Sequence, residues 1–91
     1  MIKNIITTKT KYEKQDGKWI TIDKVIKPLD KKQVDDIIES TWSYGQKGYN
    51  IKRFYEMSKF GFWFSKVTIS DRKRHKTTYE FNFKEAFNLR K

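Results

Sequence analysis

The first 26 residues contain two segments in which apolar and polar side chains alternate, the pattern of a half-buried β-strand. Between them lies Asp16-Gly17, a dipeptide favoured in two-residue hairpin turns because glycine adopts positive φ without strain. We therefore predict a β-hairpin in which residues 5–14 pair with residues 18–26. The side chains expected to share a face are Ile6, Thr8, Thr10 and Tyr12 in the first strand, and Ile20, Ile22 and Ile26 in the second.

Residues 28–45, PLDKKQVDDIIESTWSYG, change to the spacing of an amphipathic helix. Asp30 can cap the first turn, and Gln33 three residues later completes a capping-box pattern. Asp35, Asp36 and Glu39 fall on the opposite side from the apolar residues, as on a solvated helix face. The predicted apolar stripe contains Val34, Ile37, Ile38, Thr41 and Trp42.

After the helix, apolar and polar residues alternate again with the period of two that is typical of strands, in the three segments 49–57, 60–70 and 76–84. The last two are joined by the polar loop DRKRHK, and residues 85–91 are expected to form a helical turn that packs on the core. The predicted order is ββαβββ in a single domain, 1–91. The expected fold is α+β, with two layers: one amphipathic helix packed on an antiparallel sheet of about five strands.

The final two strands allow their faces to be assigned. The face with Tyr79, Phe81 and Phe83 is apolar and should be buried, which places Trp63, Val67 and Ile69 on the same side. The residues then expected on the exposed face are Phe54, Phe62, Phe64, Lys66 and Lys84.

The chain carries a formal net charge of +10, with +2 in residues 1–45 and +8 in residues 46–91. An excess of this size favours a polyanionic partner, above all nucleic acid. A basic surface that only keeps the protein in solution is the alternative. There is no cysteine and one histidine, so a thiolate zinc site is excluded and we expect no metal or cofactor.

The segment KFGFWF, residues 59–64, is unusually aromatic. It resembles the aromatic octapeptide of RNA-recognition motifs and cold-shock proteins over about six residues, but lacks the glycine directly after the basic residue. RNA-recognition motifs also have a helix between their last two strands, which residues 65–78 do not offer. The aromatic face is interpreted either as a stacking platform for bases or as a surface covered by the first hairpin or by a partner protein.

The loop before the last strand concentrates positive charge. Its five consecutive cationic or ionisable residues are Arg72, Lys73, Arg74, His75 and Lys76. At a hairpin tip they could contact phosphates, and the arginine fork suits phosphate geometry well. The alternative is a solvated turn whose charges discourage aggregation of the sheet edge.

Catalytic groups are sparse. His75 is the single histidine, and Asp71 is the nearest carboxylate in the sequence that could orient it. We therefore expect a protein that is not an enzyme, with a small basic ribonuclease toxin as a minor alternative.

These observations favour a small non-enzymatic module that binds RNA or DNA through the basic hairpin and the aromatic face. The alternative is an inhibitor or adaptor from a phage or mobile element, similar in role to anti-CRISPR proteins, that binds a host protein or nucleoprotein complex. Because no long apolar segment is present, we expect a cytoplasmic protein without a membrane partner.

Overall fold

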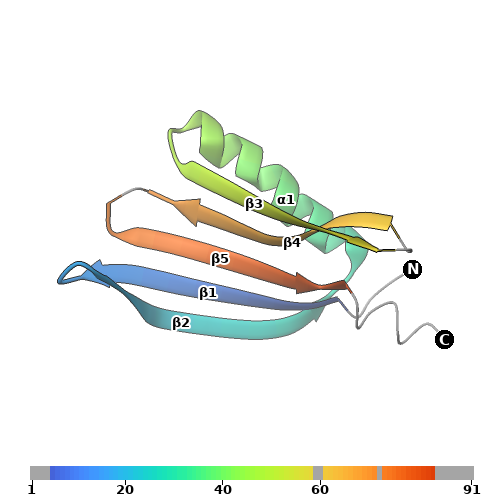
Figure 1. Cartoon of the computed structure of the whole chain (residues 1–91), viewed down its shortest axis with the longest axis horizontal. Coiled ribbons are helices and arrows are strands. Elements are labelled where there is room, and N and C mark those ends of the chain that lie inside the picture. Colours follow the sequence, from blue (N-terminus) through green and yellow to red (C-terminus); the bar gives the residue numbers. More distant parts are fainter. Residues whose placement is uncertain (1–4, 59–60, 72, 84–91) are drawn as a thin grey trace.

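The computed structural model describes residues 5–58, 61–71 and 73–83, and it confirms the predicted α+β architecture (Figure 1). The sheet has five strands, and α1 lies between β2 and β3 in the chain. The elements are β1 (Ile5–Gln15), β2 (Lys18–Leu29), α1 (Lys31–Gln46), β3 (Asn50–Ser58), β4 (Gly61–Ser70) and β5 (His75–Asn82).

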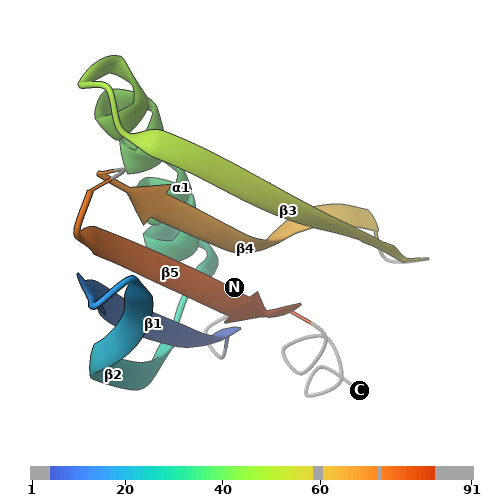
Figure 2. The same ribbon diagram turned by 60° about the vertical axis from the view of Figure 1, so that its left-hand side comes forward.

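The strands follow the order β2-β1-β5-β4-β3, and all neighbouring pairs are antiparallel. The first hairpin therefore continues the sheet beside β5 and does not fold over its face (Figures 1 and 2). Thr7 lies opposite Phe81, which joins the first and last strands in the centre of the sheet. One face of the sheet packs against α1, and we call the other the open face.

The first hairpin closes as expected at Asp16 and Gly17, which have φ angles of 52° and 78°. The pairing then shifts between Lys11 and Tyr12, so Ile22 has no direct partner in β1. Because of this shift, Ile20 lies opposite Glu13 and Ile26 lies opposite Thr8, on different faces of the sheet. The prediction that the isoleucines of this strand share one face is therefore wrong.

Helix α1 begins with the predicted capping box. The Asp30 carboxylate accepts a hydrogen bond from the Gln33 amide at 2.8 Å, and the Gln33 side chain accepts one from the Asp30 amide at 3.0 Å. Val34 and Thr41 are buried, in agreement with the predicted stripe. Trp42 lies beside the stripe and is exposed, with its ring 4.1 Å from the Arg53 guanidinium carbon.

The core lies between α1 and the sheet. Its buried members confirm the inward assignment of Val67 and Phe81, while Tyr79 is half-buried against them. The buried cluster consists of Ile5, Leu29, Val34, Val67, Phe81 and Phe83. Trp63 was predicted to join this cluster, and its side chain lies outside the described residues.

The helix packs mainly on β3 and β4, so it does not cover the part of the sheet that β2 forms. Every residue of β2 except Leu29 is exposed. Within the described residues, no helix combines the length and apolar character needed to cross a membrane. The predicted helical turn at 85–91 lies outside the described residues.

Candidate nucleic-acid interface

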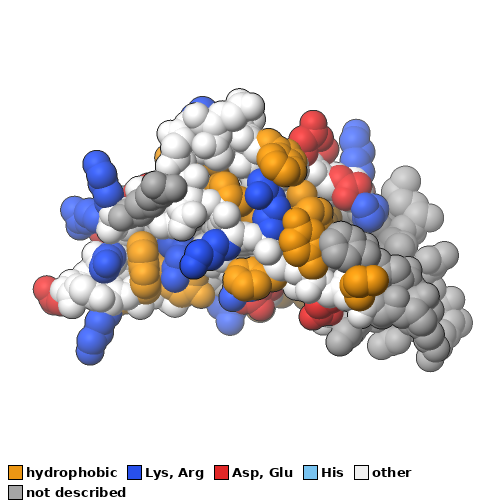
Figure 3. Space-filling view, turned by 45° about the horizontal axis from the view of Figure 1, so that its top comes forward, with side chains coloured by type: hydrophobic (Ala, Val, Ile, Leu, Met, Phe, Trp, Pro, Cys, Tyr) orange, Lys and Arg blue, Asp and Glu red, His pale blue; other side chains and the backbone are white. Residues whose placement is uncertain are grey.

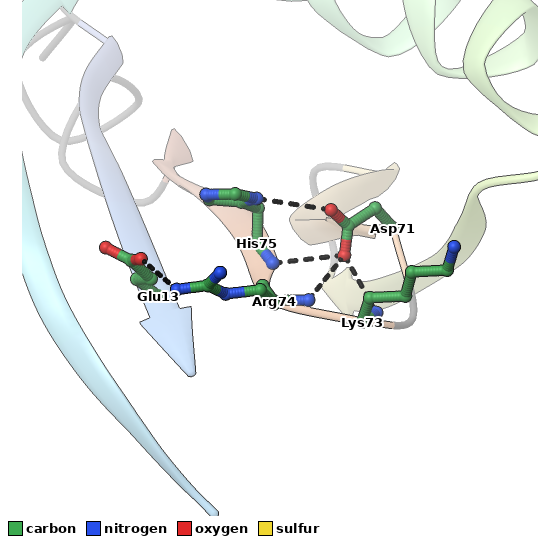
Figure 4. Close-up of polar contacts among 5 residues, drawn as sticks. All are labelled: Glu13, Asp71, Lys73, Arg74 and His75. Atoms are coloured by element: carbon green, nitrogen blue, oxygen red, sulfur yellow. Dashed lines mark hydrogen bonds and ion pairs between the residues drawn. The ribbon is translucent and has the colours of Figure 1, made fainter. Parts of the chain in front are cut away.

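The turn between β4 and β5 is organised by Asp71. Its Oδ1 atom accepts hydrogen bonds from the backbone amides of Lys73, Arg74 and His75 at 2.8, 3.0 and 3.0 Å. Its Oδ2 atom lies 3.2 Å from Nδ1 of His75 (Figure 4). The amide of His75, followed by those of Lys73 and Arg74, holds the pKa of the Asp71 carboxyl well below its usual range. The basic turn is therefore built around one carboxylate.

This geometry predicts an acid-sensitive turn. Because folding lowers the pKa of Asp71, the carboxylate stabilises the fold above the ordinary aspartate pKa of about 4, and this contribution is lost as the pH falls below it. In Asp71→Asn the amide oxygen can still accept hydrogen bonds but does not titrate. We expect wild type to melt at a higher temperature than Asp71→Asn at about pH 6, and this difference to shrink progressively as the pH is lowered from about 4 to about 2. A difference that stays constant over that range would contradict the assignment.

Strand β1 contacts the same turn. The Lys14 amide donates to the Arg74 carbonyl at 2.7 Å, and the Arg74 guanidinium lies 3.1 Å from Oε1 of Glu13. Arg74 was predicted to contact phosphate, and one side of its guanidinium is thus already paired. Its side chain is nevertheless exposed, so its remaining donors face solvent.

Side chains of adjacent strand residues point to opposite faces, so those of His75 and Lys76 lie on different faces of the sheet at the start of β5. Lys76 lies on the open face, where its Nζ atom is 4.7 Å from the centre of the Tyr12 ring and 4.6 Å from that of Trp19. Nζ of Lys14 lies 5.8 Å from the same Trp19 ring. We call these four residues the aromatic–lysine cluster.

Sequence reasoning selected Lys76 but missed Tyr12, Lys14 and Trp19. The hairpin register places Trp19 opposite Lys14, and this pairing could be predicted from the turn at Asp16-Gly17. That Tyr12 lies opposite Lys76 depends on the pairing of β1 with β5. Tyr12 and Lys14 are more than sixty positions from Lys76 in the sequence, so no local pattern predicts the cluster.

A second aromatic and basic pair lies on the open face. Nζ of Lys66 is 5.5 Å from the centre of the Phe54 ring, and the two residues are opposite one another in β4 and β3. Lys66 also lies opposite Glu80, four residues along β5 from Lys76, which corresponds to roughly 13 Å. Glu80 reduces the positive charge at this second pair.

Phe64 does not join this pair. The register of β3 and β4 shifts after Phe54, so Phe64 lies opposite Tyr55, with their ring centres 4.6 Å apart. Alternation along β3 places Tyr55 on the opposite face from Phe54. The expectation that Phe64 shares an exposed face with Phe54 and Lys66 is therefore wrong, because a bulge at Ser65 interrupts the simple alternation of β4.

The structure brings Lys73, Arg74, His75 and Lys76 together at one end of the sheet, as the sequence suggested. Arg72, Lys84 and the side chain of Phe62 lie outside the described residues. In Figure 3, hydrophobic side chains lie directly beside lysine and arginine side chains across the surface in view. Over the part of the chain that the structure describes, no three His, Cys, Asp or Glu residues gather as a metal site would require.

Comparisons with protein-family models, with characterised proteins and with solved structures found no match for this chain.

Proposed function

We propose that this protein is a non-enzymatic module that binds single-stranded RNA or DNA through the aromatic–lysine cluster and the basic turn. The observation that carries the proposal is the position of the Lys76 ammonium group within 5 Å of both the Tyr12 and Trp19 rings, next to Lys73 and Arg74. Rings and cations on one exposed surface supply the two interactions that single strands offer, base stacking and phosphate charge.

The rings favour a single strand over a duplex. In a duplex the faces of the bases are already stacked on one another, whereas a single strand can place a base against an aromatic side chain. Trp19 is 37% exposed, so part of its indole surface is available to a base. The Phe54–Lys66 pair, farther along the open face, would extend the same contact.

The proposal is tested by substituting the cluster and measuring the affinity for a labelled oligonucleotide of about 12 nucleotides by fluorescence anisotropy. We expect Trp19→Ala to weaken binding by about 1–3 kcal/mol, the usual effect of losing one stacked base. Trp42→Ala is the matched control, because Trp42 is exposed on the helix and not on the open face. Equal losses in both variants, or no binding by wild type, would contradict the proposal.

The dependence of affinity on salt provides a second prediction. If four to six phosphates are contacted, log Kd should change with log salt concentration with a slope of about 3 to 4 for a single strand. Lys76→Ala should reduce this slope by about 0.7, because one phosphate contact is lost. Lys32→Ala, on the exposed side of α1, should leave it unchanged. A slope near zero would show that phosphates are not the target.

A second candidate function is supported by β2. This strand lies at the edge of the sheet, and Trp19, Ile22, Val25 and Ile26 are exposed on it. An inhibitor or adaptor of the phage or mobile-element type could bind a host protein by adding one of its strands to this edge. A partner captured from a lysate after nuclease treatment, and lost in Ile22→Lys, would favour this function over nucleic-acid binding.

A further inference from the structure

A second site lies at the same end of the sheet, on the face that packs against α1. There the structure contains a cleft of about 290 Å³ between β1, β5 and the C-terminal end of the helix. This volume is near the lower end of the roughly 300–1,000 Å³ found for ligand pockets. The side chains that line it and carry chemistry are Lys9, Lys11, Tyr44, Tyr49, His75 and Tyr79.

The charge of the cleft favours an anion. Lys9 and Lys11 lie on one side of it, and among the described lining residues none is a carboxylate. Lys47 adds positive charge near the rim, with Nζ 5.9 Å from the centre of the Tyr44 ring. The acidic groups beside these residues are Asp71, which contacts His75, Asp23, which lies opposite Lys11 in β2, and Glu13, which lies opposite His75 in β1 and pairs with Arg74. With Arg74 counted beside Lys9, Lys11 and Lys47, there are four cations and three carboxylates around the cleft.

The aromatic rings provide a flat apolar surface beside these cations. Tyr44 and Tyr49 meet edge to face, with ring centres 5.2 Å apart and an angle of 62° between the rings, and both are partly exposed. Tyr79 forms another part of the lining, and Nζ of Lys9 lies 5.6 Å from its ring centre. An inorganic anion alone would leave these rings uncovered, whereas a base or another planar ring could pack on them.

His75 enters the cleft from the basic turn with its orientation already set. Nδ1 is directed at the Asp71 carboxylate, so Nε2 is the ring nitrogen that points away from Asp71 (Figure 4). A carboxylate partner of this kind holds an imidazole in one orientation, which leaves the other nitrogen available to a ligand. Nε2 of His75 thus adds a hydrogen-bonding group to the two lysines of the cleft.

We propose that this cleft binds a nucleoside monophosphate, with its phosphate near Lys9, Lys11 and His75 and its base against Tyr44 and Tyr49. The site lies on the opposite face of β5 from the aromatic–lysine cluster, so it goes beyond the proposed function and does not depend on it. The same chemistry is presented by a free nucleotide and by the 5′-phosphorylated end of a strand.

His75 makes the test direct, because it is the single histidine of the chain and its ring protons give isolated NMR signals. The protein is titrated separately with 5′-AMP, adenosine and inorganic phosphate. We expect AMP to shift the His75 ring signals in a saturable manner, and to bind at least about tenfold more tightly than either fragment, as expected when both parts are recognised. If AMP leaves the His75 signals unchanged, and a 5′-phosphorylated strand does so too, the proposal is wrong.

Variants locate the binding. Lys11→Ala and Tyr49→Ala should each weaken AMP binding at least about fivefold, a free-energy change of about 1 kcal/mol. Lys66→Ala is the matched control, since Lys66 lies on the open face. If Lys66→Ala weakens AMP binding as much as Lys11→Ala, the nucleotide binds elsewhere and the cleft is not its site. Unchanged chemical shifts in the rest of the spectrum would show that the variants are folded.

The two sources of the ligand are separated with a tetranucleotide that carries either a 5′-phosphate or a 5′-hydroxyl group. Tighter binding of the phosphorylated strand in wild type, lost in Lys11→Ala, would assign the cleft to a strand end. Equal binding of both strands, together with AMP binding that is sensitive to Lys11, would assign it to the free nucleotide. Both of these results support the cleft. Trp19→Ala should weaken both strands alike but leave AMP binding and any preference for the 5′-phosphate unchanged if the two faces act separately.

Discussion

Phe81→Ala is expected to lower the free energy of unfolding by about 3–5 kcal/mol, the usual cost of truncating a buried phenylalanine. Phe81 is 4% exposed, and its ring centre lies 6.3 Å from that of Tyr79 and 6.5 Å from that of Phe83. The cavity left by the ring would lie where β1, β5 and α1 meet, so its neighbours could refill it only by moving the backbone. Urea denaturation followed by tryptophan fluorescence measures the change.

Phe54→Ala is the matched control, because Phe54 is 46% exposed on the open face. A surface change of this kind usually alters stability by no more than about 0.5 kcal/mol. If the two variants lose the same stability, the open face is covered in solution. If neither loses stability, Phe81 does not lie in the core.

Ile5→Ala should be the next most damaging change, with a loss of about 2–5 kcal/mol. Ile5 is fully buried at the start of β1, opposite Leu29 of β2. It belongs to the same cluster as Val34, so its side chain links the first hairpin to the helix. Thermal unfolding monitored by circular dichroism would report the loss as a clear fall in Tm.

Ile26→Ala provides the comparison for this residue. Ile26 has the same side chain and lies in the neighbouring strand, yet it is 59% exposed. We expect a change within about 0.5 kcal/mol. A large loss in Ile26→Ala would mean that another chain or a second copy covers β2, which would favour the protein-partner function over the nucleic-acid one.

Local features of the fold were readable from the sequence because their causes are local. The turn at Asp16-Gly17 needs positive φ, and the chain offers glycine there. The capping box needs a carboxylate and an amide three residues apart, and Asp30 and Gln33 meet that need. The α+β class followed from one helical period among several strand periods.

The candidate site could be predicted only in part. The basic turn at 71–76 is a run of adjacent residues, so its existence was evident from the sequence. Its organisation around Asp71 was not evident, because it depends on three backbone amides converging on one carboxylate oxygen. The contribution of Phe64 to the open face was predicted wrongly, since the bulged residue Ser65 puts Phe64 and Lys66, on either side of it, on opposite faces.

Strand order was decided by the tertiary structure alone. The alternation of apolar and polar residues shows which side chains share a face of a strand, but it does not show which strand will be the neighbour. Pairing of β1 with β5 brings Tyr12 and Trp19 to Lys76 on one face, and Lys9 and Lys11 to His75 on the other. Both proposed sites therefore arise from a contact between the two ends of the chain, which depends on burial of Ile5 and Phe81 in one shared core and not on any local sequence pattern.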